Sequence, residues 1–376
     1  MKRFTLAILI FTLPTLCFSQ AKQRPRSYGL TFGVIPTGNL NSITDVKGVK
    51  VGHETLIKGN SIRTGVTAIL PHGGNLFQEK VPAAVFVANG FGKLAGSTQI
   101  QELGNLESPI ILTNTLSVPV GMIGATTFML GLNGNEKVKS INTVVGETND
   151  GVLNDIRSRS INEQHVLNAI QNASVENSLE GNVGAGTGTV CFGFKGGIGT
   201  SSRKLPESLG GYTVGVLVQT NFGGNLQVAG VPIGEELGKF SFSNQLLNNV
   251  DGSCMIIVAT DAPIDSRNLE RLAKRAFLGL GKTGGIASNG SGDYVIAFST
   301  YKSGLEVKAT SKTPTQNLLI NDALSPLFMS AIEATEEAII NSLFMAQDQE
   351  GHENSKIKAL PLDKVLPLLK KYNRIK

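Results

Sequence analysis

The sequence is poor in the residue types that most often bind metals. It contains no tryptophan, three cysteines and four histidines in 376 residues. The histidines (His53, His72, His165 and His352) lie far apart, and neither an HExxH motif nor a paired-cysteine spacing occurs, so we expect no metal site. No Gly-x-Ser-x-Gly motif is present, although a Ser-His-Asp triad stays open. Lysine and arginine form no run, so no nucleic-acid partner is expected.

Long apolar runs are also missing, except at the N-terminus. Lys2 and Arg3 precede a mostly apolar stretch, residues 4–18, which Pro14 interrupts. This pattern predicts a signal peptide over residues 1–19, cleaved after Ser19. The stretch is too short to span a membrane. Its removal takes away two positive charges and no negative charge, so the formal charge falls from +5 to +3. We therefore expect a soluble, exported protein, periplasmic or secreted, without a membrane span.

The three cysteines bear on anchoring and on disulfides. Cys17 suggests a lipoprotein anchor, but Leu16 is bulky where such a site needs a small residue. Cys191 and Cys254 both lie in apolar, strand-like runs. In an exported protein they could form one disulfide or remain two buried thiols, and the sequence leaves both alternatives open.

The pattern along the chain is typical of an α/β protein. Several short runs are continuously apolar, which indicates strands covered on both faces. Such runs lie at 49–53, 65–70, 83–88, 109–113, 143–146, 212–218, 254–260 and 293–300, and helical patterns at 121–132, 162–173, 265–280, 320–347 and 362–372. No repeat or linker interrupts residues 20–376. A layered α/β sandwich in a single structural domain is therefore predicted.

Three glycine-rich segments invite a nucleotide-binding interpretation. Residues 276–283 (AFLGLGKT) match a loose phosphate-binding loop, but a helix precedes them where a strand is required, so we interpret Gly281 as the end of that helix. Residues 184–188 and 196–199 lack the third glycine of the dinucleotide fingerprint. We interpret them as tight connections that flank a strand at 190–194.

The most informative feature is the dipeptide Gly252–Ser253. It follows a polar, Asn-rich run at 243–251 and precedes the apolar strand at 254–260. Glycine can adopt strained conformations and leaves its carbonyl open to attack by the next hydroxyl. Cleavage there would make Ser253 a new N-terminus with a hydroxyl nucleophile and an α-amine, whose usual pKa of about 7.7–8.0 suits a general base. The alternative is a tight turn that enters a strand.

Two other polar groups lie at strand ends. Asn221 ends an apolar strand, where its amide could stabilise an oxyanion or cap a turn. Ser291 and Asp293 occupy alternate positions at the start of a strand, so their side chains should project to the same side. A hydroxyl and a carboxylate in that arrangement could orient an α-ammonium group or tune a nucleophilic serine.

Together these segments resemble the DmpA-type aminopeptidases, the family of the L-aminopeptidase/D-esterases and β-peptidyl aminopeptidases. The resemblance covers nearly the whole chain after the signal peptide. It is carried by residues 43–53 (ITDVKGVKVGH), 63–71 (RTGVTAILP), 89–90 (NG), 112–115 (LTNT), 144–148 (VVGET), 181–184 (GNVG), 194–203 (FKGGIGTSSR) and 251–263 (DGSCMIIVATDAP).

The resemblance implies an αββα-like sandwich, self-cleaved into an N-terminal (α) polypeptide, 20–252, and a C-terminal (β) polypeptide, 253–376, with αβ units assembled into a homo-oligomer. It implies no cofactor. Ser253 matches the family's nucleophile, Asn221 its oxyanion donor and Ser291 its supporting hydroxyl. Asp293 stands where family members carry glutamate, and Asn149 where some carry a tyrosine that holds the oxyanion.

The predicted function is that of an exported serine aminopeptidase, which releases N-terminal residues from short peptides or amino-acid amides or esters. Two alternatives stay open. Ornithine acetyltransferases share the general fold and the self-cleavage, but they carry threonine where this chain has Ser253. A peptide-binding protein that kept the fold and lost the chemistry would also fit the changes at Asp293 and Asn149. The sequence does not fix whether the preferred N-terminal residue is L, D or β.

Overall fold

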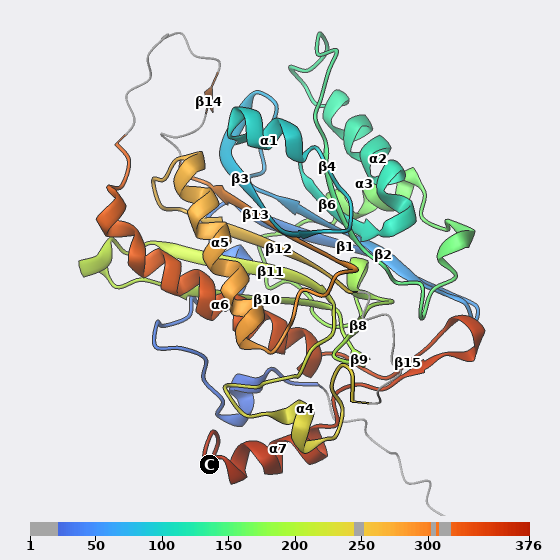
Figure 1. The fold of residues 1–376 in the computed structure, drawn as a ribbon. Coiled ribbons are helices and arrows are strands. Elements are labelled where there is room, and N and C mark those ends of the chain that lie inside the picture. Colours follow the sequence, from blue (N-terminus) through green and yellow to red (C-terminus); the bar gives the residue numbers. More distant parts are fainter. Residues whose placement is uncertain (1–21, 244–251, 302–305, 308–316) are drawn as a thin grey trace, which may run out of the picture.

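A computed structural model describes residues 22–243, 252–301, 306–307 and 317–376. Two β-sheets are stacked face to face, and helices cover the outer face of each sheet (Figure 1). The predicted αββα sandwich in a single domain is confirmed. The predicted signal peptide, and the polar run before Gly252 from residue 244 onward, lie outside the described residues.

The first sheet has five strands. In spatial order they are β1 (Lys50–Lys58), β2 (Ile62–Leu70), β6 (Ile110–Asn114), β7 (Val144–Thr148) and β4 (Leu94–Ala95). The strands β6 and β7 pair in parallel, and their neighbours pair antiparallel. The parallel pair matters for the site because Thr115 and Asn149, the residues that follow its two ends, line the pocket that contains Ser253.

The second sheet has seven strands and contains the Gly252–Ser253 dipeptide. In spatial order they are β10 (Ile198–Lys204), β11 (Thr213–Asn221), β12 (Gly252–Thr260), β13 (Ser291–Ser299), β3 (Glu79–Gly90) and β14 (Glu306–Val307), and β5 (Asn105–Leu106) also pairs with β3. All nine residues of β11, of β12 and of β13 are buried. Burial on both faces explains why these three strands are continuously apolar rather than alternating.

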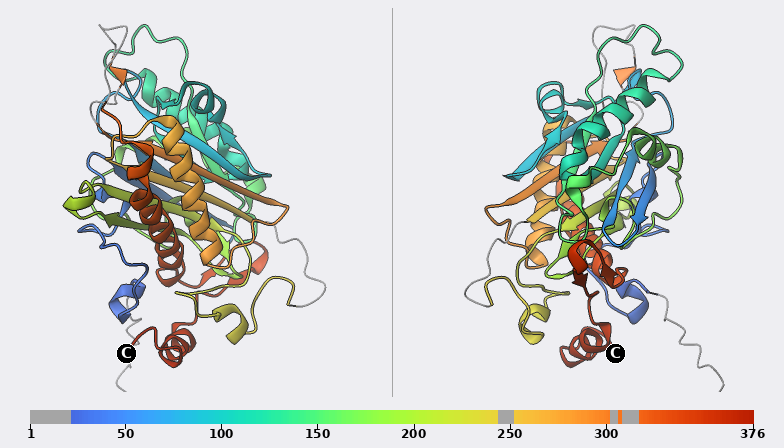
Figure 2. Two further views of the ribbon diagram at one scale, coloured as in Figure 1. Left: turned by 60° about the vertical axis from the view of Figure 1, so that its left-hand side comes forward. Right: turned by 90° about the vertical axis from the view of Figure 1, so that its right-hand side faces the viewer.

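Helices complete the two outer layers. The helices are α1 (Ser97–Leu103), α2 (Val118–Leu130), α3 (Glu163–Gln171), α4 (Ile233–Glu236), α5 (Ser266–Lys282), α6 (Ser325–Phe344) and α7 (Leu362–Lys371). The pair α5 and α6, orange and red in Figure 2, packs on the second sheet, and α2 and α3 pack on the first. Asp265 begins α5 by accepting a hydrogen bond from the Asn268 amide at 2.8 Å, as expected for an N-cap.

Two local interpretations from the sequence are wrong. Residues 190–194 do not form one strand. They form the short pair β8 (Val190–Cys191) and β9 (Phe194–Lys195), joined through Phe192 and Gly193, both with positive φ. The helix α5 also does not end at Gly281. It continues to Lys282, and the left-handed residue that the turn requires is Gly284, with φ +86°.

The remaining structural questions from the sequence have plain answers. The segment 184–186 is a short 3₁₀ helix, and the Lys195 ammonium donates to the carbonyl oxygens of Gly186 at 2.9 Å and Gly196 at 2.7 Å. These glycine loops are therefore packed around a buried lysine. Cys191 and Cys254 are free, buried thiols. No described helix is long and apolar enough to cross a membrane.

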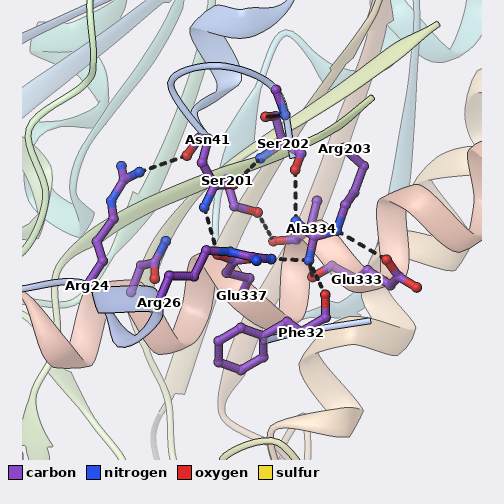
Figure 3. A network of polar contacts seen from close by, with 12 residues as sticks. Arg24, Arg26, Phe32, Asn41, Ser201, Ser202, Arg203, Glu333, Ala334 and Glu337 are labelled. Atoms are coloured by element: carbon purple, nitrogen blue, oxygen red, sulfur yellow. Dashed lines mark hydrogen bonds and ion pairs between the residues drawn. The ribbon is translucent and has the colours of Figure 1, made fainter. Parts of the chain in front are cut away.

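A buried charge network joins the N-terminal segment to α6. The Arg203 guanidinium, fully buried, lies 2.8 Å from Glu337 Oε2 and 3.1 Å from Glu333 Oε2, and Arg26 contacts both oxygens of Glu337 at 2.5 and 2.7 Å (Figure 3). Burial alone would raise the pKa of Glu337, but the hydrogen bond from Arg26 and the charges of Arg203 and Arg26 hold it below its usual value. The network ties β10 and residues 24–41 to the far side of α6.

We expect Arg203→Met to lower the free energy of unfolding by about 3–5 kcal/mol, because it leaves buried carboxylates with too little positive charge. Lys274→Met is the matched control. It removes an exposed i,i+4 pair with Glu270, which is worth only about 0.3–0.5 kcal/mol. Urea denaturation followed by circular dichroism measures both. Equal losses in the two variants would contradict the importance of the buried network.

Candidate active site

The predicted site residues meet at one end of three neighbouring strands. In the register of the sheet, Asn221 of β11 lies directly opposite Ser253 of β12, and Ser253 is paired with Gly292 of β13. Ser253 and Asn221 are buried at the wall of a pocket of about 820 Å³. Directly opposite residues of an antiparallel pair lie on the same face with Cβ atoms about 4.5–5.5 Å apart. The structure therefore brings the serine and the amide together.

Gly252 precedes the serine in β12 and has a specific steric role. A Cβ atom at this position would lie 3.0 Å from Ser291 Oγ and 3.2 Å from Phe222 Cβ. The missing side chain lets the Ser291 hydroxyl approach the Gly252–Ser253 peptide bond.

The Ser253 hydroxyl lies against the bond that it was predicted to cut. Its Oγ donates to the Gly252 carbonyl oxygen at 2.5 Å. The hydroxyl oxygen is thus held next to the carbonyl group, within reach of its carbon by a small rotation. Chemically, this is the starting arrangement for a shift of the Gly252 acyl group from nitrogen to oxygen.

The Asn221 side chain has a fixed orientation. Its Oδ1 accepts a hydrogen bond from the backbone amide of Val190 at 3.0 Å. With the oxygen held in this way, the Nδ2 group, which has no partner within the described residues, is the free end of the amide. A donor held in place beforehand by a second hydrogen bond is what stabilisation of an oxyanion requires.

Ser291 and Asp293 form a hydrogen-bonded pair, as their alternate spacing predicted. Ser291 Oγ donates to Asp293 Oδ1 at 2.8 Å, so the shorter carboxylate of aspartate reaches the hydroxyl. Both residues are buried, and Asp293 Oδ2 has no hydrogen-bond partner among the residues described. Burial raises the pKa of Asp293 to about 6. Small changes of pH around 6 therefore change the charge of the Asp293 carboxyl group.

The two pairs lie on opposite faces of the second sheet. Side chains two residues apart in a strand lie on the same face. Ser253 and Asn221 therefore share a face with Met255 and Leu217, which pack in the core between the sheets. Ser291 and Asp293 share a face with Val295, which packs in the core under α5 and α6. The Gly252–Ser253 bond lies between the two pairs. Ser291 can therefore act on the main chain at this bond, and Asn221 lies on the same side as the Ser253 hydroxyl.

Two residues outside the predicted set complete the site. Asn89, at the end of β3, donates through Nδ2 to the carbonyl oxygens of Ser288, at 3.0 Å, and of Ser291, and so fixes the turn before β13. Glu147 provides the only carboxylate among the described residues that line the pocket. No role for Glu147 was predicted, and the available signal was a charged residue near the end of an otherwise apolar strand.

The Glu147 carboxylate is buried and held by its neighbours. Oε1 accepts a hydrogen bond from the Lys93 amide at 3.0 Å, Oε2 accepts one from Thr115 Oγ1, and Lys93 Nζ lies 3.8 Å from Oε1. A Cβ atom at Gly92 would lie 3.1 Å from Glu147 Oε1 and equally close to the Cα atom of Gly292, the partner of Ser253. A negative charge is thus placed on the β13 side of the serine.

Of the other predicted candidates, Asn149 lines the pocket and the histidines do not. Asn149 is exposed and lines the pocket, and its Oδ1 accepts from the Gly151 amide at 2.9 Å, which leaves its Nδ2 facing outward from that turn. None of the four histidines, all within the described ranges, lines the pocket, and His53 instead contacts Thr67 and Ser178 at 3.0 Å. A Ser-His-Asp triad around Ser253 is therefore ruled out. No group of metal-ligating side chains occurs in the part of the chain described.

Comparison with solved structures identifies the fold. A solved L-aminopeptidase D-Ala-esterase/amidase from Ochrobactrum anthropi, described as a variant among the Ntn hydrolase folds, superimposes with a TM-score of 0.86 at 33% identity and covers 94% of this chain and 99% of its own. A Burkholderia sp. β-aminopeptidase gives the same TM-score at 39% identity, with 93% and 99% covered. The fold is thus that of the Ntn-type, or N-terminal-nucleophile, hydrolases.

The family follows from the sequence itself. Residues 41–357 match peptidase family S58, and the chain belongs to this family. The β-peptidyl aminopeptidase BapA of Sphingosinicella microcystinivorans is 40% identical over 375 residues, with 94% of this chain and 93% of that protein covered. The resemblance to the DmpA-type aminopeptidases is confirmed, and the protein is an aminopeptidase. A non-catalytic binding protein and an acetyltransferase are correspondingly disfavoured.

The pKa of Asp293 is open to direct measurement. We expect the side-chain carbon signal of Asp293 to titrate with a midpoint near pH 6, against an ordinary value of 3.8, because burial penalises the charged form. Carbon-13 NMR of Asp-labelled Ser253→Ala protein measures this in the uncut chain that the structure describes. Comparison with Asp293→Asn and Asp150→Asn distinguishes the two aspartates whose pKa burial raises to about 6. A midpoint near 4 for Asp293 would contradict the prediction.

Proposed function

We propose that the protein is an exported, self-processing serine aminopeptidase that releases N-terminal residues, β-amino acids among them, from short peptides. The observation that carries this proposal is the juxtaposition of Ser253 with the amide of Asn221 on one side and the Gly252 carbonyl on the other. The β-peptidyl preference is supported by the identity to relatives named for that activity.

The self-cleavage step uses groups already in contact. Ser253 Oγ attacks the Gly252 carbonyl carbon, the C–N bond breaks, and the acyl group passes to oxygen as an ester while Ser253 gains a free α-amine. Water then hydrolyses the ester to the Gly252 carboxylate and the Ser253 hydroxyl. Ser291, 3.0 Å from the position of a Gly252 Cβ atom, lies beside the nitrogen that becomes this amine. Asp293 accepts its hydrogen bond and orients the hydroxyl.

Peptide hydrolysis then repeats the chemistry on a substrate. Ser253 Oγ attacks the carbonyl of the substrate's N-terminal residue, and its proton passes to the Ser253 α-amine, whose usual pKa of about 7.7–8.0 leaves it partly neutral at physiological pH. Asn221 Nδ2 donates to the oxyanion, and Asn149 lies in the same pocket as a second amide. The leaving amine takes the proton, and water releases the acyl residue from Ser253.

The same geometry favours aminopeptidase over endopeptidase action. A substrate with a free N-terminus carries an ammonium group, and the Glu147 carboxylate, buried on the β13 side of Ser253, is its counter-ion in our proposal. Where the ammonium group is bound close to the nucleophile, only the first peptide bond can reach Ser253. A β-amino acid adds one methylene between ammonium and carbonyl, and the pocket volume of about 820 Å³ accommodates it.

The proposal also includes export and homo-oligomer formation, and each is supported by a separate observation. The charged and apolar pattern of residues 1–19 supports export. Homo-oligomer formation is supported by α2, which contains no charged residue and leaves Met122, Ile123 and Leu130 exposed. A helix that is apolar on every side usually requires a partner for its outer face.

Self-processing predicts two chains in the purified protein. We expect mass spectrometry and N-terminal sequencing to find one fragment that begins Ser253–Cys254–Met255 and a larger one that ends at Gly252. Ser253→Ala should remain a single chain and show no turnover, because it lacks the attacking hydroxyl. Conversion of Ser253→Ala protein into the same two fragments, in the presence of protease inhibitors, would contradict self-cleavage by this serine.

The role of Asn221 predicts a large effect on turnover. Loss of one oxyanion donor typically costs about 2.7–4 kcal/mol, or roughly 10²–10³ in kcat, so we expect Asn221→Ala to lose that much with its circular dichroism spectrum unchanged. The Val190 hydrogen bond is also lost, so Asn221→Asp serves as the control, since its carboxylate can keep that bond but cannot donate. Steady-state kinetics on protein already cleaved at Gly252 isolates turnover from processing. Near-normal kcat in both variants would show that the oxyanion is held elsewhere.

A further inference from the structure

A lysine in the same pocket has no role in the chemistry described so far. Lys239, in the segment that follows α4, lines the pocket together with Ser253. The lining residues within the described ranges include three charged side chains: Lys93, Glu147 and Lys239. Lys93 is 3.8 Å from Glu147, whereas Lys239 has no carboxylate partner among the residues described. Within the described residues, the Lys239 ammonium group therefore has no counter-ion in the pocket.

The position of Lys239 is built into the fold. Its ammonium group lies 4.1 Å from the centre of the Phe194 ring, a cation–π contact that holds the side chain against β9. A Cβ atom at Gly193 would lie 2.7 Å from Lys239 Cε, so the absence of a side chain at Gly193 makes room for the lysine stem. The Lys239 amide donates to the Gly234 carbonyl at 2.8 Å. The side chain is half-buried, and burial lowers its pKa from the ordinary value.

Lys239 and Glu147 approach the serine from opposite sides. Glu147 lies on the β13 side, next to Gly92 and Gly292. Lys239 lies on the β11 side, because its stem packs against Gly193. The residue before Gly193 is Phe192, whose amide donates to the Phe222 carbonyl at 2.7 Å. Phe222 directly follows the last residue of β11. The strand that carries Ser253 runs between these two sides. Neighbouring strands are about 4.8 Å apart, so β11 and β13, on the two sides of the strand that carries Ser253, are separated by roughly 10 Å.

The polarity of a bound substrate follows from this arrangement. With the ammonium group at Glu147 and the scissile carbonyl at Ser253, the residue that leaves must extend toward the β11 side. A chain of two extended residues spans about 7 Å and one of three about 10 Å. The free carboxylate of a dipeptide or tripeptide would therefore come within reach of the Lys239 ammonium group, whereas a longer peptide would place its carboxylate beyond it.

We propose that Lys239 binds the C-terminal carboxylate of short peptide substrates, and that this makes the protein selective for dipeptides and tripeptides with a free C-terminus. The inference rests on the proposed function, since it needs peptide cleavage at Ser253. It goes beyond that function in naming the leaving side of the substrate and the residue that recognises it. Lys239 acts on substrate affinity and takes no part in bond breaking.

The test compares three substrates with the same N-terminal residue. They are β-homoalanyl-L-leucine, its C-terminal amide and β-homoalanine p-nitroanilide, assayed with the full, processed enzyme. A hydrogen-bonded charge pair contributes enough affinity for a change of about tenfold or more. We expect Lys239→Met to raise KM for the free dipeptide about tenfold, with kcat nearly unchanged, and to leave the amide and the anilide unaffected. Lys239→Arg should retain the preference for the free acid.

Two comparison variants make the result specific. Glu147→Gln should raise KM for the acid and for the amide alike, because it acts on the ammonium end that both substrates share. Lys274→Met removes one positive charge from the exposed face of α5 and should change neither. In the wild type, the preference for acid over amide should shrink as sodium chloride is added, since salt screens a partly exposed charge pair.

The outcomes separate the two proposals. Equal changes for acid and amide in Lys239→Met, or no change for either, would overturn the inference about Lys239 while the aminopeptidase activity of the wild type stands. Anilide turnover equal to the wild type shows that the variant is folded and processed. A wild-type enzyme that cleaves none of the three substrates, nor their L-alanyl counterparts, would overturn the proposed function itself.

Discussion

The site depends on the register of three strands, β11, β12 and β13. Their pairing places Asn221, Ser253 and Gly292 side by side, and it continues for the whole length of β12. Because side chains alternate along a strand, a slip by one residue would turn Ser253 toward α5 and Cys254 toward the pocket. Apolar side chains on both faces of all three strands make such a slip costly. The packing of the core therefore fixes the position of Ser253, the nucleophile that we propose.

The same packing explains how a cut chain would stay in one piece. Cleavage at Gly252 would assign β10 and β11 to the first polypeptide and β12, β13, α5 and α6 to the second. The β11–β12 pairing, the contacts of α6 with β10, and the ion pairs from Arg26 and Arg203 to α6 all join these two parts. Apart from the last pair of the β11–β12 ladder, Asn221 with Ser253, these interactions lie away from the Gly252–Ser253 bond. Processing could thus create a free amine at the centre of a sheet without disturbing that sheet.

The polar and charged groups around Ser253 lie in separate parts of the site. Asn221 and the Ser253 hydroxyl lie on the face between the sheets, and Ser291 and Asp293 lie on the face toward α5. In the proposed mechanism, the backbone therefore separates the nucleophile from the pair assigned to the new amine. Glu147 and Lys239 lie on either side of this line. In our proposal, a short peptide with charges at both ends matches that distribution better than a neutral or a long substrate does.

The sequence by itself determined the strands and the main helices, and it pointed to Ser253, Asn221, Ser291 and Asp293 as candidate site residues, because buried runs, alternation and a long ordered resemblance are all local or linear signals. It did not determine the hairpin within 190–194 or the end of α5, where positive φ at Phe192, Gly193 and Gly284 sets the turn. Only the tertiary structure showed where Glu147, Asn89 and Lys239 lie relative to Ser253. These residues come from separate segments, and their partners lie tens to hundreds of positions away in the chain. The physical reason is that the chemistry of a charged side chain depends on the groups that surround it in space, and a single sequence does not show which groups those are.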